Sequence, residues 1–167
     1  IKKTANLGNA ISLNSGDHSE VSSLTIELID KEELVNDHCI TIKDANYSRI
    51  NSVTFTGMTG EGFGCFMYSS DELSPVYAVS IENTNHESTS ADPTGPSGGA
   101  MLVDTEFGLI SNTRTKGVER FPVELKGNST YCITENSFIK DCTYGLYYGT
   151  QTLNHPSYSI ANNIIVK

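Results

Sequence analysis

Carboxylate side chains in neighbouring segments are the first candidates for chemistry. Asp104 and Glu124 lie in two short apolar runs, and Glu106 extends the first of them. A glycoside hydrolase needs two carboxyl groups roughly 5 to 9.5 Å apart, and their separation decides whether a carboxylate or a water attacks the sugar. The sequence therefore predicts a hydrolytic set made of Asp104, Glu124 and Glu106.

A small basic cluster suggests a different chemistry. A polysaccharide lyase needs a cation that offsets the substrate carboxylate and a base that removes the neighbouring proton. In this hypothesis Arg114 and Lys126 supply the charge, and Tyr147 or Tyr144 shuttles the proton. The full cluster, in a chain of net charge −9, is Arg114, Lys116, Arg120 and Lys126. Both sets of residues are equally compatible with a network of surface charges.

Aromatic residues complete the predicted binding face. Phe66, Tyr68 and Tyr147 offer ring faces on which sugars stack, and Arg120 offers hydrogen bonds to the substrate. The alternative is a face that is solvated or covered by another subunit, which outward-facing Phe66 and Leu102 would favour. No cysteines or histidines have the spacing of a metal site, so neither a metal nor another cofactor is predicted.

A repeat positions these residues. Residues 21–26 match residues 50–55, and residues 131–140 match residues 158–167. A polar corner recurs beside the repeated strands, and we place it at residues 22, 51, 83, 112, 136 and 163. Five of these residues are asparagine, which tolerates the left-handed backbone of a tight bend. A repeat whose period varies slightly, as the spacing of these corners does, and whose strands are short is the signature of a solenoid.

A second series of strands is predicted at residues 39–42, 64–67, 100–103, 122–125 and 145–148. Side chains alternate along a strand, so Met101 and Val103 are predicted to face inward. We align one outward column as Thr41, Phe66, Leu102, Glu124 and Tyr147. The next outward column is Lys43, Tyr68, Asp104, Lys126 and Gly149. This alignment places Asp104 and Glu124 on adjacent repeats.

The length of 167 residues fits one domain over residues 1–167, with residues 1–19 leading into the repeats. Residues 84–99 are polar and rich in glycine and proline, which predicts an inserted loop. The first residue is not methionine and the last lies inside a repeat, so we expect a piece of a longer chain or a processed product. The acidic net charge argues against a nucleic-acid partner. No apolar run is long enough for membrane insertion.

Residues 135–142, which read ENSFIKDC, and residues 144–149, which read YGLYYG, add to the pattern of corner asparagines. With them, residues 20–167 resemble a right-handed parallel β-helix of about 5–6 rungs, of the pectate-lyase-like kind and most closely that of bacteriophage tailspikes. The resemblance implies a homotrimer in the virion tail that acts outside the cell on bacterial capsule or O-antigen polysaccharide. It also implies folding in a bacterial cytoplasm, which fits the buried free thiols expected at Cys39, Cys65 and Cys132. No catalytic motif of the family matches residue by residue.

The expected function is a polysaccharide depolymerase that binds a bacterial surface glycan and cleaves it by hydrolysis. A lyase that cleaves by β-elimination is one alternative, and a non-catalytic receptor-binding or structural stalk is another. A pectin or alginate lyase is a further alternative. Such lyases often bind calcium through clustered aspartates, and this sequence has no tight aspartate cluster.

Overall fold

The computed structural model describes residues 2–3, 10–28, 38–57, 63–88, 98–118, 121–149 and 156–167. Within these ranges the chain is all-β, with 17 strands and no helix. The strands pair in parallel in two large sheets and one short sheet. The predicted all-β class and the parallel stacking of strands are therefore confirmed for these residues.

Sheet A is the larger sheet. Its strands are β1 (Lys2–Lys3), β3 (Glu20–Leu28), β5 (Arg49–Thr56), β8 (Ser80–Glu82), β9 (Asn85–Glu87), β12 (Leu109–Ser111), β13 (Arg114–Lys116), β15 (Ile133–Lys140) and β17 (Ile160–Val166). Both β8 and β9 pair with β5, and both β12 and β13 pair with β15, so each pair is one interrupted strand. The interruptions fall at Asn83 and Asn112, where positive φ angles turn the backbone out of the extended conformation.

Sheet B has the strand order β16-β14-β10-β6-β4-β2. These strands are β2 (Ile11–Asn14), β4 (Ile40–Lys43), β6 (Phe63–Tyr68), β10 (Gly98–Val103), β14 (Val123–Lys126) and β16 (Leu146–Gly149). The short third sheet, sheet C, pairs β7 (Val76–Tyr77) with β11 (Thr105–Glu106), and isolated bridges continue it to Thr130 and Ser157.

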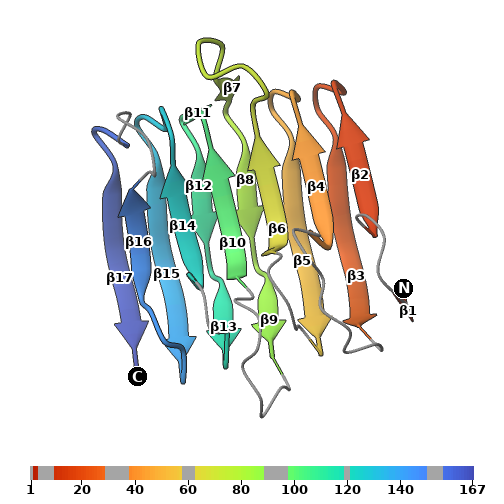
Figure 1. The fold of residues 1–167 in the computed structure, drawn as a ribbon, viewed down its shortest axis with the longest axis vertical. Coiled ribbons are helices and arrows are strands. Elements are labelled where there is room, and N and C mark those ends of the chain that lie inside the picture. Colours follow the sequence, from red (N-terminus) through yellow and green to blue (C-terminus); the bar gives the residue numbers. More distant parts are fainter. Residues whose placement is uncertain are drawn as a thin grey trace.

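The two large sheets form two layers. In Figure 1 the strands of sheet B lie in front and point upward, whereas those of sheet A lie behind and point downward. The colours run in order from one side of the molecule to the other, because each repeat of the chain adds one strand to sheet B and then one line of strand to sheet A.

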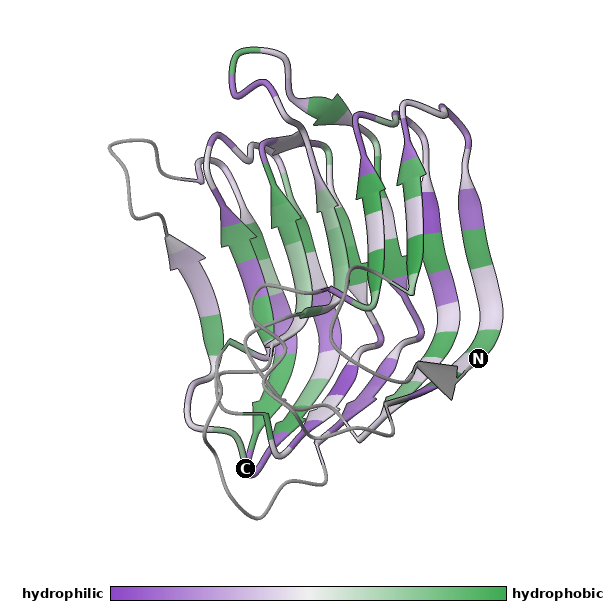
Figure 2. Cartoon of the chain, turned by 45° about the vertical axis from the view of Figure 1, so that its right-hand side comes forward, coloured by the Kyte–Doolittle hydropathy of each residue, from purple (hydrophilic) through white to green (hydrophobic). Residues whose placement is uncertain are grey.

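Alternating side chains fill the space between the layers. Figure 2 shows apolar bands that alternate with polar or neutral bands along many strands. The inward column of sheet A begins with Val21, Ile50, Ile81 and Ile110, and all four are buried. These β-branched residues favour the extended backbone and supply the apolar surface whose burial stabilises the layers.

The core also contains polar side chains, of which His86 is the largest. Its imidazole is fully buried, stacks on Phe55 at a ring-centroid distance of 4.8 Å and lies 2.9 Å from the Thr84 hydroxyl. Burial lowers the pKa of His86 to about 3, because a charged ring would lose its hydration. His86 is therefore neutral in the folded protein at physiological pH.

The corner of the first two repeats lies one residue later than predicted. Asn51 pairs with Glu82, so the left-handed corner residues are Ser23 and Ser52 rather than Ser22 and Asn51. The remaining corner residues are those predicted, and each has a positive φ: Asn83, Asn112, Asn136 and Asn163. Serine and asparagine both bond to nearby backbone groups, which is why they suit a left-handed position.

The predicted inserted loop at residues 84–99 is wrong at both ends. Asn85–Glu87 forms β9, and β10 already begins at Gly98. Residues 89–97 lie outside the described residues. The cysteine prediction is confirmed, because the thiols of Cys39, Cys65 and Cys132 form no disulfide and are buried. Only Cys65 of these three lies inside a strand.

Candidate functional site

The register of sheet B differs from the prediction by one residue in β10. Met101 pairs with Phe66 and Glu124, and Leu102 pairs with Met67 and Leu125. Leu102 is therefore an inward residue of the core and not an outward one. A slip of one residue moves every side chain of a strand to the other face, so Met101 and Val103 take the outward positions.

This register separates the predicted carboxylate pair. Asp104 follows Val103, which pairs with Lys126, whereas Glu124 pairs with Met101. The two residues are thus three positions apart along the strands, which corresponds to roughly 10 Å. The carboxylate of Asp104 accepts a hydrogen bond of 2.7 Å from the backbone N–H of Asn128, so it links the turns of two repeats.

Glu124 and Glu106 have different surroundings from Asp104. The side chain of Glu124 is only 4% exposed, and its carboxylate lies 4.0 Å from the ammonium group of Lys126. Glu106 lies in sheet C, where its Cα pairs with that of Tyr77. Asp104 and Glu124 thus lie apart along the strands, whereas Glu106 follows Asp104 by two residues and belongs to sheet C.

The predicted lyase set is also divided. Arg114 is exposed on sheet A, whereas Lys126 and Tyr147 lie on sheet B. Outward side chains of two packed sheets point in opposite directions, so Arg114 does not face Tyr147. Arg120 lies outside the described residues. Of the aromatic residues predicted to bind sugar, Phe66 and Tyr68 stack on each other at 4.5 Å, and Tyr147 stacks on Phe121 at 4.1 Å.

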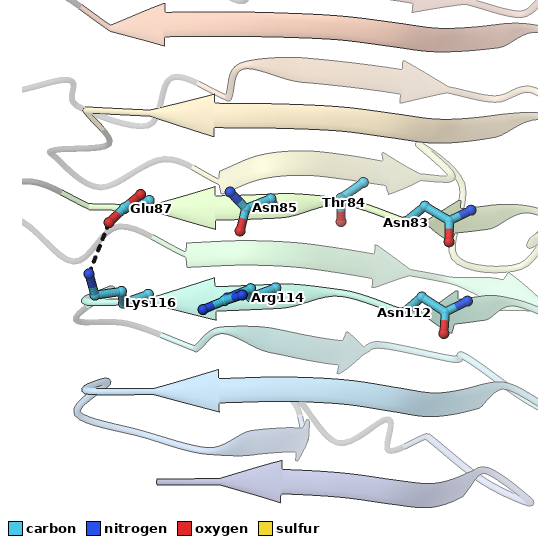
Figure 3. A pocket seen from close by; sticks show the side chains of 7 residues that line it. All are labelled: Asn83, Thr84, Asn85, Glu87, Asn112, Arg114 and Lys116. Carbon is cyan, nitrogen blue, oxygen red and sulfur yellow. Dashed lines mark hydrogen bonds and ion pairs between the residues drawn. The ribbon is translucent and has the colours of Figure 1, made fainter.

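A groove with a volume of about 430 Å³ lies instead on the outer face of sheet A. Figure 3 shows its side chains projecting from two adjacent lines of strand, one formed by β8 and β9 and the other by β12 and β13. The lining residues are Asn83, Thr84, Asn85, Glu87, Asn112, Arg114 and Lys116, and all of them except the buried Thr84 present amide or charged groups. Such groups donate and accept the hydrogen bonds that sugar hydroxyls require.

The corners and the alternation of the strands together position this groove. Arg114 pairs with Asn85, and Lys116 pairs with Glu87, so matching side chains lie side by side. The ammonium group of Lys116 lies 3.0 Å from the Glu87 carboxylate. The guanidinium of Arg114 lies 5.5 Å from the ring centre of Phe138 on β15, close enough for a cation–π contact.

A second surface is a continuous column of aromatic rings, which we call the aromatic column. Adjacent ring centroids lie between 5.0 and 5.6 Å apart along His18, Tyr47, Tyr77, Phe107, Tyr131 and Tyr158. Tyr77 is the only member that meets both of its neighbours edge-on, because the left-handed position of its repeat is taken by Ala78. The rings are exposed, with Phe107 at 46% and Tyr131 at 48%.

Sequence reasoning missed both surfaces, although both have a signal. Tyr131 and Tyr158 open the two matched segments, two residues before β15 and β17 begin. His18, Tyr47 and Phe107 stand in the same place before β3, β5 and β12. The groove residues lie two and four positions after the corner asparagines, where alternation points them outward.

No protein-family model matches this chain, and no curated protein matches it. The described residues contain no helix long and apolar enough to cross a membrane. They also contain no group of three or more His, Cys, Asp or Glu side chains arranged to hold a metal ion.

Proposed function

We propose that this chain is a segment of a right-handed parallel β-helix that binds a polysaccharide of the bacterial surface along the outer face of sheet A. The parallel pairing of successive repeats supports the winding, because connections between parallel strands of one sheet are almost always right-handed. The tailspike resemblance supplies the class of ligand. It also adds to the proposal a homotrimer, a place in the virion tail and folding in a bacterial cytoplasm.

The groove is the observation that carries this proposal. It is polar and lies between two adjacent lines of strand, along which its lining side chains are spread. Asn83 and Asn112 present the same amide group on adjacent lines of strand, which lie about 4.8 Å apart. A ligand that is itself a repeating chain can bond to both. Binding in such a groove needs no movement of the sheets.

The test measures binding of the purified chain to a panel of bacterial capsule and O-antigen polysaccharides. Asn85→Ala and Arg114→Ala, on the groove, are expected to weaken binding about tenfold each. Ser12→Ala is the control, because Ser12 is an exposed polar residue of β2 in sheet B. Equal binding by all three variants, or no binding to any polysaccharide, would contradict the proposal.

Hydrolysis of the bound glycan is the second candidate function. Glu82 and Glu135 both pair with Ser111, from its two sides, in one outward column beside the groove. Their Cα atoms are roughly 10 Å apart by strand spacing, so their carboxyl groups can reach the separation of an inverting glycosidase. Ser111 is buried between them.

The cleavage assay separates three outcomes. New reducing ends that disappear in Glu82→Gln and Glu135→Gln but persist in Asp104→Asn and Glu124→Gln would place hydrolysis on sheet A. The reverse pattern would place it on the acids predicted from sequence. Absorbance from an unsaturated uronate would indicate a lyase, and binding without cleavage would favour the non-catalytic receptor-binding stalk.

A further inference from the structure

The outward-facing residues near the C-terminal ends of the sheet A strands form a column. Their charge changes from negative to positive from the first repeats to the last. Glu27 pairs with Thr56, Thr56 with Glu87, Glu87 with Lys116, and Lys116 with Lys140. Lys167 follows Val166, the partner of Ile139, and so continues the column beside Lys140. The lysine column is thus Lys116, Lys140 and Lys167.

Three lysines on consecutive strands are unfavourable for the sheet itself. Neighbouring strands lie about 4.8 Å apart, and like charges directly opposite one another destabilise the pairing. The attraction of Glu87 for Lys116 and of Asp141 for Lys140, at 3.0 and 3.8 Å, offsets part of this repulsion. These pairs are exposed, so their contribution is small.

Arg114 increases the positive charge of the same region. It lies on the next outward column, and its guanidinium lies over the ring of Phe138. The ammonium group of Lys167 lies 5.9 Å from the centre of the same ring. Phe138 lies on β15, between the strand that carries Arg114 and the strand that leads into Lys167, and its ring is within reach of both cations. Four cations therefore gather at the ends of three adjacent strands, beside the carboxylates of Glu87 and Asp141, in a chain whose net charge is −9.

We propose that the lysine column and Arg114 bind the acidic groups of the polysaccharide, so that the ligand of the groove is an anionic glycan with regularly spaced carboxylate, sulfate or phosphate groups. This inference rests on the proposed function, because it names the class of glycan that the same face binds. The argument is charge complementarity: the lysine column begins at the groove, where Lys116 is a lining residue, and continues away from it along the direction in which strands stack.

The first experiment compares matched polymers at equal ionic strength. The wild-type chain is titrated with polygalacturonate and its carboxyl-reduced form, and with dextran sulfate and dextran. We expect each acidic polymer to bind at least tenfold more tightly than its neutral partner, with affinity falling as salt rises. The ratio between polygalacturonate and dextran sulfate shows whether carboxylates or sulfates are preferred.

The second experiment removes charge without disturbing the Glu87–Lys116 pair. The double variant Lys140→Gln, Lys167→Gln is expected to lower affinity for the acidic polymers about tenfold and to leave binding of the neutral ones unchanged. Lys43→Gln on sheet B is the control and is expected to change neither. Circular dichroism of all variants shows whether the strands are retained.

The outcomes distinguish this inference from the proposed function. If acidic and neutral polymers bind equally and Asn85→Ala abolishes this binding, the proposal of an anionic ligand is wrong, whereas the proposal that the groove binds a glycan is retained. A loss as large in Lys43→Gln would overturn the assignment to the lysine column. Tighter binding of a single-stranded oligonucleotide than of any polysaccharide would contradict the proposal that the ligand is a glycan. Binding of none of these polymers would overturn the anionic ligand, and binding of no bacterial polysaccharide in the first panel would overturn the proposed function as well.

Discussion

Two corners of each repeat use the same backbone conformation with opposite residue types. At the asparagine corner the left-handed residues are Ser23, Ser52, Asn83, Asn112, Asn136 and Asn163. At the aromatic corner they are His18, Tyr47, Ala78, Phe107, Tyr131 and Tyr158. In both, the N–H of the left-handed residue donates to a carbonyl of the next repeat, as in the 3.0 Å bond from Asn83 to Ser111 and the 3.1 Å bond from Phe107 to Thr130.

The difference lies in how the backbone conformation is tolerated. Asparagine adopts it readily, whereas a bulky residue incurs roughly 1–2 kcal/mol. An inner ring of the aromatic column stacks on two neighbours, and each aromatic pair contributes about 0.5–1.5 kcal/mol. Stacking and strain are therefore of similar size. Residue type follows the local backbone at the asparagine corner, but at the aromatic corner it follows the contact between repeats.

The largest expected effect concerns the core that lies between the two corners. Acidification from pH 7 to pH 4 is expected to lower the free energy of unfolding by on the order of 3 kcal/mol through His86 alone. The pKa of His86 is about 3 when folded and 6.5 as the ordinary value, so below pH 6.5 the unfolded chain binds a proton that the folded chain does not. Stability is thus lost as pH falls.

Urea unfolding at both pH values, followed by circular dichroism, measures this effect. His86→Phe preserves a ring against Phe55 and is expected to remove that part of the pH dependence. An unchanged pH dependence in His86→Phe would show that other groups are responsible. Retention of either corner after the core has unfolded would break the comparison, since both corners depend on the same strands.

Removing an inner ring of the aromatic column is expected to have the next largest effect. Tyr131→Ala eliminates the stacking with Phe107 and with Tyr158 but retains the left-handed backbone, so it should lower the free energy of unfolding by about 2 kcal/mol. Tyr158→Ala eliminates a single described ring pair and serves as the graded control, with about half the effect. Equal losses from the two variants would contradict additive stacking.

The asparagine corner is expected to respond to backbone preference alone. Asn112→Ala should lower the free energy of unfolding by about 1 kcal/mol, because alanine disfavours the left-handed conformation. Asn112→Gly should stay within about 0.5 kcal/mol of the wild type, because glycine has no Cβ to disfavour it. Chemical unfolding of Tyr131→Gly beside Tyr131→Ala sharpens the comparison, since glycine should recover the strain but not the stacking.

The smallest expected effect concerns the side-chain bonds between asparagines. Asn83 donates its amide to the Asn51 carboxamide oxygen at 2.9 Å, and Asn163 donates to Asn136 at 2.8 Å. Both bonds are exposed, so Asn51→Ala should lower the free energy of unfolding by only about 0.5 kcal/mol. A loss above 2 kcal/mol in the same unfolding assay would show that side-chain bonds, rather than backbone tolerance, select asparagine here.

Periodicity alone predicted the strands, because β-branched residues alternate with polar ones and the corner asparagines recur. It did not determine the register of β10, since Ala100, Met101 and Leu102 are all apolar and fit either face. The positions of two glycines indicate the register of β10. Gly64 and Gly99 share a register position, and a Cβ there would collide with His86 at Gly64 and with the Pro122 carbonyl at Gly99.

The candidate site was less predictable than the fold, since it depends on which residues become neighbours across repeats. Asp104 was chosen for its carboxylate, yet that carboxylate serves a turn, as does the one of Asp44, which accepts a 2.7 Å bond from Ser70. Hydrogen bonds from Ser70 lower the pKa of Asp44 accordingly. Arg114 was recognised as a candidate, but its neighbours Asn85 and Phe138 emerge only from the pairing.

The aromatic column also gives the protein an optical property. The chain has no tryptophan, and four of its eight tyrosines, Tyr47, Tyr77, Tyr131 and Tyr158, stand in this column. Its near-ultraviolet absorption and intrinsic fluorescence therefore come largely from rings within 5.6 Å of another ring. Energy transfer between these chromophores turns the column into a built-in reporter, whose signal changes when neighbouring repeats separate.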